Sequence, residues 1–238
     1  MLRVEGLHAW YGESHVLHGV DLEVPDGEIV TLVGRNGMGK TTTLRCIMGL
    51  HPVAGGAGGR TKQGRISLDG RDITHLTPQR IARLGVGWVQ DDRGIYSRLT
   101  VLEHLRLPPV VGDQAWSVDR IFEAFPMLKE RAATPGSKLS GGEQQILAVA
   151  RVLRMGARVL LMDEPTEGLA PIIVRRLGEI LRDIKGHGLT VLLVEQNLRF
   201  ATMVADRHYL IVNGRTVNTL SNQEAARQEQ ELLAYLGV

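Results

Sequence analysis

Two apolar runs constrain the fold of this chain more than any other feature. Residues 159–162 and 190–194 consist almost entirely of β-branched residues and leucine, which is the composition of strands buried on both faces of a parallel sheet. Shorter β-rich runs at 29–33 and 86–89 alternate with helix-length segments. This alternation is typical of α/β proteins, in which helices pack on a mainly parallel sheet, and it predicts such a core here.

Antiparallel strands are predicted beside this core. Residues 3–8 and 16–24 alternate between apolar and polar side chains, as half-buried strands do. Near the other end, Asn-Gly at 213–214 separates the runs 209–212 and 215–219, and Asn-Gly between two such runs is a strong hairpin signal. We therefore expect an antiparallel β subdomain in addition to the parallel sheet.

Three further segments complete the organisation. From about residue 100 to 137, short helical segments are separated by prolines, which predicts an α-helical subdomain inserted into the α/β core. The glycine-rich stretch 54–64 is expected to be a surface loop. The tail 222–236 is expected to be a helix with one buried face. The residues expected on that face are Ala226, Leu232, Leu233 and Leu236.

The composition excludes several classes of protein. The 238 residues carry 28 Lys and Arg against 26 Asp and Glu, and this net charge of +2 is scattered along the chain, so strong attraction to nucleic acid is not indicated. The single cysteine, Cys46, excludes an internal disulfide and a cysteine-based zinc site. The eight histidines show no metal-ligand spacing, so we predict no zinc. No apolar run approaches the roughly 18 residues that span a bilayer.

The clearest chemical motif begins at residue 34. The sequence Gly-Arg-Asn-Gly-Met-Gly-Lys-Thr at 34–41 matches G-x-x-x-x-G-K-[ST] and lies between a predicted strand and a predicted helix. Its glycines let several backbone N–H groups point at one anion, and the helix N-terminus adds a positive end. Lys40 would bridge the terminal phosphates, and Thr41 would offer its hydroxyl to Mg²⁺. The candidate phosphate-binding residues are Gly34, Arg35, Asn36, Gly37, Met38, Gly39, Lys40, Thr41 and Thr42.

Two acids follow the predicted buried strand at 159–162. Asp163 and Glu164 stand at its carboxyl end, where open α/β sheets bind ligands. Neighbouring residues of a strand point to opposite sides, so we expect the two carboxylates to do different work. Asp163 suits Mg²⁺, and Glu164 suits the attacking water as a base or an orienting acceptor. Together with the phosphate motif they predict a Mg-nucleotide site.

A third motif opens a predicted amphipathic helix. Ser140 is placed as an N-cap with Glu143 three residues later, which is the spacing of a capping box. Gly141 and Gly142 leave the start of the helix bare, so its N–H groups and Ser140 could also hold a phosphate. The motif therefore predicts both a helix start and a second phosphate contact.

Together these motifs resemble the ATP-binding subunits of ABC transporters over almost the whole chain. Leu-Ser-Gly-Gly-Glu at 139–143 is similar to the family signature. Gln90 matches the glutamine that reaches Mg²⁺ and the attacking water and contacts the membrane subunits, and Tyr11 matches the aromatic residue that stacks on adenine. The resemblance implies the ABC ATPase fold, with a P-loop NTPase core. Residues 1–238 would form one nucleotide-binding domain, whose helical subdomain covers about 100–155 and bears the signature.

Two departures from the common family pattern point to a subgroup. Gln196 stands where most members have a histidine that touches the γ-phosphate. Its amide can donate a hydrogen bond, but unlike histidine it cannot take up a proton or carry a positive charge. Ala170 stands where an aspartate is common. Val-Glu-Gln-Asn at 194–197 and Gly-Leu-Ala-Pro at 168–171 resemble the ATPases of branched-chain amino acid importers. A related branch of urea and amide importers shares much of this pattern.

The resemblance also implies partners. The signature of one chain completes the phosphate site of another, so two ATP molecules are sandwiched between head-to-tail subunits, and the mate is a paralogue or an identical copy. Dimer closure on ATP and reopening after hydrolysis would drive two transmembrane permease subunits, served by an extracytoplasmic solute-binding protein. The chain would lie, as a peripheral subunit that is soluble when isolated, at the cytoplasmic face of a prokaryotic membrane, and no nucleic acid is expected.

Two other classes of function remain as alternatives. One is a soluble ABC-type ATPase that is not coupled to transport; such chains commonly carry two cassettes or basic extensions, whereas this chain carries a single cassette. The other is a nucleotide-binding regulator that does not hydrolyse ATP. The intact Lys40, Asp163 and Glu164 disfavour that regulator.

Overall fold

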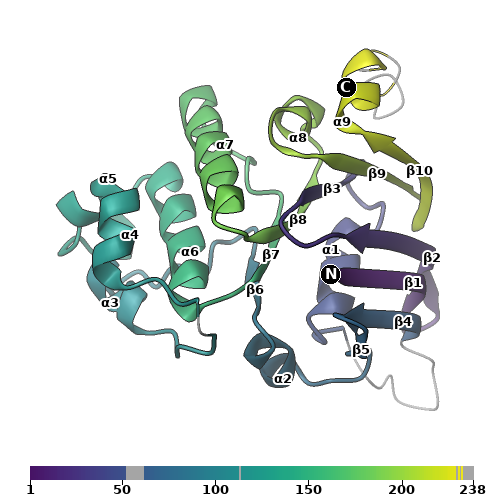
Figure 1. The fold of residues 1–238 in the computed structure, drawn as a ribbon, viewed down its shortest axis with the longest axis horizontal. Helices are drawn as coiled ribbons and strands as arrows, with labels where there is room; N and C mark the ends of the chain where they lie inside the picture. The colour runs from purple at the N-terminus through teal and green to yellow at the C-terminus, as the bar shows by residue number, and fades with distance from the viewer. Residues whose placement is uncertain (52–61, 113, 229, 231, 233–238) are drawn as a thin grey trace.

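A six-stranded sheet forms the centre of the molecule (Figure 1). In this computed structural model, which describes residues 1–51, 62–112, 114–228, 230 and 232, the strand order is β10-β9-β3-β8-β7-β6. All neighbours are parallel except β10, which pairs antiparallel with β9. The strands are β3 (Ile29–Val33), β6 (Val86–Val89), β7 (Val159–Asp163), β8 (Thr190–Glu195), β9 (Arg207–Val212) and β10 (Arg215–Ser221).

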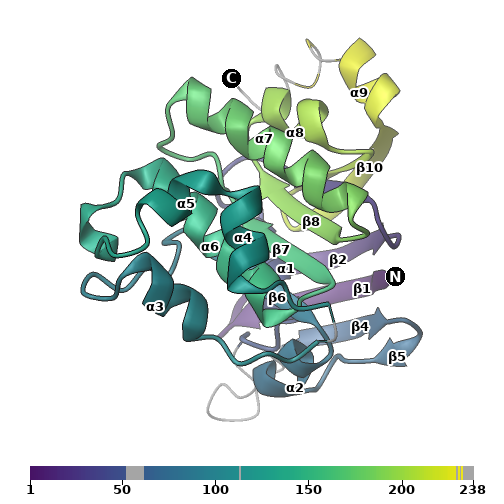
Figure 2. The same ribbon diagram turned by 60° about the vertical axis from the view of Figure 1, so that its left-hand side comes forward.

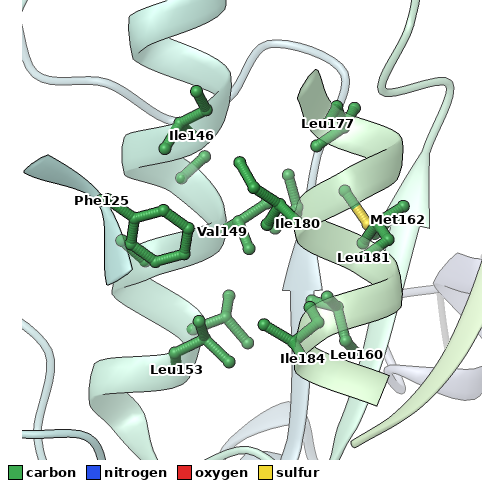
Figure 3. Packing of buried hydrophobic residues seen from close by; sticks show 14 of the residues in the cluster. Phe125, Ile146, Val149, Leu153, Leu160, Met162, Leu177, Ile180, Leu181 and Ile184 are labelled. Carbon is green, nitrogen blue, oxygen red and sulfur yellow. The ribbon is translucent and has the colours of Figure 1, made fainter. Parts of the chain in front are cut away.

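The four predicted core strands are confirmed, and two of them extend one residue further, to Asp163 and Glu195. Successive residues of β7 pack into different cores. Leu160 and Met162 face helices α6 (Gly141–Met155) and α7 (Pro171–Gly186), whereas Leu161 belongs to a second cluster, which also contains side chains of the antiparallel sheet. Figure 3 shows the first core, in which side chains of α6 and α7 meet over the sheet. Burial on both faces explains why these strands are continuous apolar runs.

A second, antiparallel sheet has the strand order β2-β1-β4-β5. Its strands are β1 (Leu2–Tyr11), β2 (Ser14–Val24), β4 (Lys62–Leu68) and β5 (Arg71–Asp72). The predicted hairpin is confirmed as β9–β10, and its turn has Asn213 at φ 45° and Gly214 at φ 71°, the positive values that a two-residue hairpin turn favours. The two sheets are tied together where the backbone N–H of Glu23 donates to the Tyr209 hydroxyl at 3.1 Å.

The helices between β6 and β7 form a group at one side of the molecule (Figures 1 and 2). Short helices α3, α4 and α5 pack beside the long α6. The remaining helices flank the sheets. The bounds are α1 (Lys40–Ile47), α2 (Pro78–Arg83), α3 (Val101–Arg106), α4 (Val118–Ala124), α5 (Pro126–Glu130), the 3₁₀ helix η1 (Gly136–Lys138), α8 (Leu198–Val204) and α9 (Asn222–Arg227). Among the described residues no helix combines the length and the hydropathy needed to cross a membrane.

Two expectations need correction. The loop predicted at 54–64 ends earlier, because residues 62–64 already belong to β4, in which Lys62 and Gln63 pair with β1. Residues 54–61 lie outside the described residues. In the tail, Ser221 caps α9, and this start turns Ala225 rather than Ala226 toward the core. Leu232 is buried as expected, whereas positions 233 and 236 lie outside the described residues.

Candidate active site

The phosphate motif folds as a loop between β3 and α1. Gly39 is the N-cap of α1 with φ 99°, and a Cβ atom there would lie 2.5 Å from the Leu17 side chain, so only glycine fits this position. A Cβ at Gly34 would lie 2.6 Å from Ile211. The glycines are therefore required by conformation and by space, and they leave the start of α1 uncovered.

An open cavity of about 360 Å³ adjoins this loop. It brings together residues that follow or stand at the carboxyl ends of three parallel strands, β3, β6 and β7. Its lining consists of Val16, Asn36, Gly37, Gly39, Lys40, Thr41, Thr42, Asp91, Asp163 and Glu164. Gly34, Arg35 and Met38 belong to the loop but do not line the cavity. The structure thus joins most of the predicted phosphate motif to both predicted acids.

Lys40 is the most constrained of the charged side chains. It is only 3% exposed, and its Nζ donates to the carbonyl oxygens of Gly34 at 2.8 Å and Arg35 at 3.0 Å. It also forms an ion pair with Glu164, whose Oε1 lies 2.8 Å away. The loop carbonyls hold the ammonium group at the cavity, and the carboxylate of Glu164 balances its charge.

Asp163 and Thr41 form a second side-chain pair at the cavity. The Thr41 hydroxyl donates to Asp163 Oδ1 at 3.0 Å, while the buried Oδ2 of Asp163 has no hydrogen-bond partner. Burial raises the pKa of Asp163 to about 6, with further contributions from Asp91 and Glu164, and the hydrogen bond from Thr41 opposes this rise. A hydroxyl beside a carboxylate oxygen that lacks a donor fits a Mg²⁺ ion.

The expectation that Asp163 and Glu164 point to opposite sides is wrong. Both side chains line the same cavity. The physical reason is the backbone of Glu164, which has φ 43° and so leaves the strand geometry directly after Asp163. The alternation of side chains that holds within a strand ends there, and the turn brings Glu164 to Lys40.

Glu195 is a buried acid that the motifs did not single out. Its Oε1 accepts hydrogen bonds from the Thr166 hydroxyl at 2.8 Å and the Thr166 N–H, and its Oε2 accepts from the N–H groups of Gln196 and Asn197. Burial raises its pKa to about 7, and these hydrogen bonds oppose the rise. Glu195 therefore ties the segment after β7 to the segment after β8, which carries Gln196. The sequence signal that could have found it is an acid directly at the carboxyl end of an apolar strand, as for Asp163.

Gln90 and Asp91 lie on different surfaces. Both follow β6, but Asp91 lines the phosphate cavity, whereas Gln90 is exposed and lines a separate groove beside α6. Asp91 could have been found from sequence, because β6 ends at the same edge of the sheet as β7. The structure therefore places Asp91 nearer to the predicted metal ligands than Gln90.

The signature residues form the predicted helix start. Ser140 caps α6 and makes the capping box with Glu143 in both directions. A Cβ at Gly142 would lie 2.6 Å from Ile173 of α7, so packing as well as ligand access requires glycine there. Ser140, Gly141, Gly142 and Glu143 are not among the residues that line the phosphate cavity.

Three further residues that the sequence singled out lie outside the cavity lining. Tyr11 ends β1, is 37% exposed, and its ring meets the edge of the buried His51 ring at a centroid distance of 4.7 Å. Gln196 is half-buried directly after β8. Ala170 is exposed and is the N-cap residue of α7. None of these three lines the cavity in this conformation.

Comparisons with known proteins agree with this geometry. The family model described as "ABC transporter" matches residues 17–167. The high-affinity branched-chain amino acid transport ATP-binding protein BraG of Pseudomonas aeruginosa is 38% identical over 240 residues and covers all of both chains. The probable branched-chain amino acid transport ATP-binding protein LivF of Archaeoglobus fulgidus is 37% identical and covers 98% of each chain.

Solved structures support the same assignment at the level of the fold. The crystal structure of a nucleotide-free ATP-binding cassette from an ABC transporter superposes with a TM-score of 0.83 at 22% identity, covering 100% of this chain and 98% of that one. The fold, the phosphate loop, the acidic strand end and the signature helix agree with the family match over most of the chain. The chain therefore belongs to the ATP-binding subunits of the ABC transporter family.

Proposed function

We propose that this chain is the Mg²⁺-dependent ATPase subunit of an importer for branched-chain amino acids, and that it forms one half of an ATP-driven dimer on two permease subunits. The observation that supports ATPase activity is that four side chains line one cavity: those of Lys40, Thr41, Asp163 and Glu164. The cargo is supported by the two relatives named for branched-chain amino acid transport. It is also supported by the segments 194–197 and 168–171.

The charged residues suggest how a nucleotide would be handled. A phosphate oxygen arriving at the loop competes with Glu164 for the ammonium group of Lys40. Once Lys40 pairs with phosphate, the Glu164 carboxylate is free to accept a hydrogen bond from a water molecule and orient it for attack. Thr41 and Asp163 would hold Mg²⁺, which when bound neutralises negative charge on the phosphate oxygens.

The position of the signature residues supports a dimer. The signature residues start a capped helix but do not line the phosphate cavity of their own chain. Their bare helix start is available to a phosphate held by a second subunit. We therefore assign Ser140, Gly141, Gly142 and Glu143 to the nucleotide of the partner subunit, which is a paralogue or an identical copy.

Phosphate release tests the ATPase directly. We expect the purified chain to release phosphate from ATP with Mg²⁺ and to stop when EDTA removes the metal. Lys40→Ala should lose activity because nothing replaces the cation at the loop, and Glu164→Gln should bind ATP but turn over at least about a hundredfold more slowly. Glu123→Gln changes an exposed acid of α4 and is the matched control. Wild-type turnover by Glu164→Gln would remove Glu164 from its role.

Uptake by reconstituted vesicles tests the cargo. The chain, its mate and two permease subunits would be reconstituted with the solute-binding protein outside and ATP inside. We expect ATP-dependent uptake of leucine. Uptake of urea without leucine would overturn the cargo and leave the ATPase assignment intact.

A further inference from the structure

His51 is a buried histidine to which the sequence motifs assign no role. It follows α1, and its backbone N–H donates to the carbonyl oxygen of Arg45 in that helix at 3.1 Å. The residue is only 1% exposed. Burying the polar ring nitrogens of a histidine is unfavourable unless they are hydrogen-bonded. The contacts of the ring therefore indicate what the histidine does at this position.

One contact of the ring is with the backbone of β1. Nε2 of His51 lies 3.0 Å from the carbonyl oxygen of Trp10. A carbonyl oxygen can only accept a hydrogen bond, so Nε2 carries the proton and donates it. This bond holds the end of β1 against the segment that follows α1, one residue before Tyr11.

Another contact of the ring is with the side chain of Tyr11. The two ring centroids lie 4.7 Å apart and the ring planes cross at 75°, which is an arrangement that aromatic pairs favour. Crossed planes leave at least one face of the Tyr11 ring free of His51, and Tyr11 is 37% exposed. A free aromatic face can stack on a nucleobase. His51 therefore restrains the orientation of this ring without enclosing it.

Strand β2 fixes the same end of β1 from another direction. Trp10 stacks almost flat on His15, with ring centroids 4.2 Å apart and an angle of 9° between the planes, and the two residues are paired across β1 and β2. Tyr11 pairs with Ser14, two residues before Val16, which lines the phosphate cavity. The Tyr11 ring therefore lies on the strand end next to the Val16 side of that cavity.

Helix α1 connects His51 to the phosphate loop. The helix begins at Lys40, which lines the cavity, and it is only eight residues long. At its other end the N–H groups of Leu50 and His51 both donate to the carbonyl oxygen of Arg45, at 2.8 and 3.1 Å. The helix lies beside β2 (Figure 1). One short helix and the turn that follows it therefore set the position of Tyr11 relative to the phosphate loop.

We propose, on the basis of the ATPase function above, that His51 is a positioning residue for the base of ATP, because its ring sets the orientation in which Tyr11 meets that base. Its hydrogen bond to Trp10 keeps the His51 ring in place at the end of β1. His51 then contributes to the affinity for the nucleoside part of ATP and acts through Tyr11. The contacts of Lys40 with phosphate do not depend on it.

A comparison of ATP with inorganic tripolyphosphate, which lacks the nucleoside, tests this role. The Kd of each would be measured by titration calorimetry in EDTA. Tyr11→Ala should weaken ATP binding at least about fivefold, because the stacking of the base is lost. His51→Gln keeps an N–H donor but removes the ring, and it should weaken ATP binding about threefold to tenfold. Neither change should move the Kd for tripolyphosphate more than about twofold.

Two further variants separate positioning from a general effect on the fold. His208→Gln is the matched control, because His208 is also 1% exposed and its ring nitrogens bond to Thr31 and Asn222. It should leave the ratio of the two Kd values unchanged. Combining Tyr11→Ala with His51→Gln should weaken ATP binding no more than Tyr11→Ala alone, because His51 acts through Tyr11.

Thermal melting shows whether each variant is folded. His51→Leu also lacks the aromatic ring and takes the place of His51→Gln if that variant does not fold. We expect His51→Leu to shift the ratio of the two Kd values in the same direction. An unchanged ratio in a folded variant without the ring would overturn the proposal.

The remaining outcomes distinguish the possible failures. An equal loss of ATP and tripolyphosphate binding in His51→Gln would assign His51 to the stability of the phosphate loop and overturn the proposal. A further loss in the double variant would overturn it as well, because His51 would then act without Tyr11. If Tyr11→Ala leaves the ratio unchanged, the stacking role of Tyr11 fails, and the role of His51 fails with it. If the wild-type chain does not bind ATP, the proposed ATPase function itself fails.

Discussion

The ion pair between Lys40 and Glu164 occupies the position at which a nucleotide phosphate would meet the loop. Lys40 uses its remaining donors on the carbonyls of Gly34 and Arg35, so a phosphate has to displace Glu164 to reach the ammonium group. The residue proposed for catalysis thus also limits nucleotide affinity before ATP binds. This competition can be measured apart from hydrolysis.

Removing the charge of Glu164 should tighten nucleotide binding. We expect Glu164→Gln to lower the Kd for ATP in EDTA by about threefold to tenfold, because a charge-assisted contact to Lys40 and a repulsion of phosphate are both lost. Titration calorimetry without metal measures this while hydrolysis is off. An unchanged or higher Kd, compared with the control Glu123→Gln, would show that the ion pair does not compete with phosphate.

The charged form of Asp163 is predicted to destabilise the folded chain when no metal ion is bound. Burial raises its pKa from 3.8 to about 6, so the folded state disfavours the charged form. This electrostatic penalty on folding is absent below the unfolded pKa, grows as the pH rises, and is fully present above about 6. Asp163→Asn should therefore stabilise the nucleotide-free chain at pH 7.5 by roughly 1–3 kcal/mol, about 1.4 kcal/mol for each pKa unit removed.

Thermal melting at two pH values checks this prediction. We expect Asp163→Asn to melt a few degrees higher at pH 7.5 than wild type and to differ less at pH 5, where Asp163 is mostly neutral. The extra stabilisation that Mg²⁺ gives to the ATP-bound chain should disappear in the variant. A lower melting temperature at pH 7.5, or a retained effect of Mg²⁺, would contradict the assignment.

At the scale of elements, the start of α6 packs so closely against α7 that Gly142 has no room for a side chain. A Cβ at Gly142 would lie 2.6 Å from Ile173 Cγ2 and 3.0 Å from two other atoms of that side chain. A Cβ at Gly141 would lie 3.3 Å from the end of the flexible Arg93 side chain and at an ordinary contact distance of 3.6 Å from Leu169 Cδ2. Both glycines lie in the first turn of the same helix. They form a matched pair in which only packing differs.

We expect Gly142→Ala to destabilise the chain by about 1–3 kcal/mol through overpacking and Gly141→Ala to have a much smaller effect. The double variant Gly142→Ala with Ile173→Ala should recover part of the loss, because the clash disappears. Urea unfolding of wild type, Gly142→Ala, Ile173→Ala and the double variant measures this coupling, and Gly141→Ala is the control. Equal effects of Gly141→Ala and Gly142→Ala would show that the α6–α7 contact does not select glycine.

At this scale the sequence predicted most elements but not their exact ends. The core strands were found because burial on both faces leaves a continuous apolar run, and the β9–β10 hairpin was found because Asn213 and Gly214 favour the required turn. The left-handed backbone of Glu164 was not predictable, because contacts from distant segments, including Lys40, stabilise it. The inward face of α9 was misplaced by one residue, because it depends on where Ser221 caps the helix.

At the scale of the whole molecule, the most important feature is that the signature residues lie apart from the phosphate cavity of the same chain. The phosphate loop and the signature start different helices, α1 and α6, and no signature residue lines the cavity beside Lys40. If one chain completes the site of another, a defect in either motif damages a site shared by two chains. Such sites can be reassembled from two differently damaged chains.

Mixing two inactive variants tests this arrangement. Lys40→Ala removes the phosphate loop cation, and Ser140→Arg blocks the start of the signature helix. A dimer of one chain of each kind keeps one site made of two intact halves, so an equal mixture should recover up to about a quarter of wild-type phosphate release if half of the dimers are mixed and their sites act independently. If each chain used its own signature, every site in the mixture would carry a defect, and no activity would return. Recovery therefore requires that the signature of one chain serve the ATP of its partner.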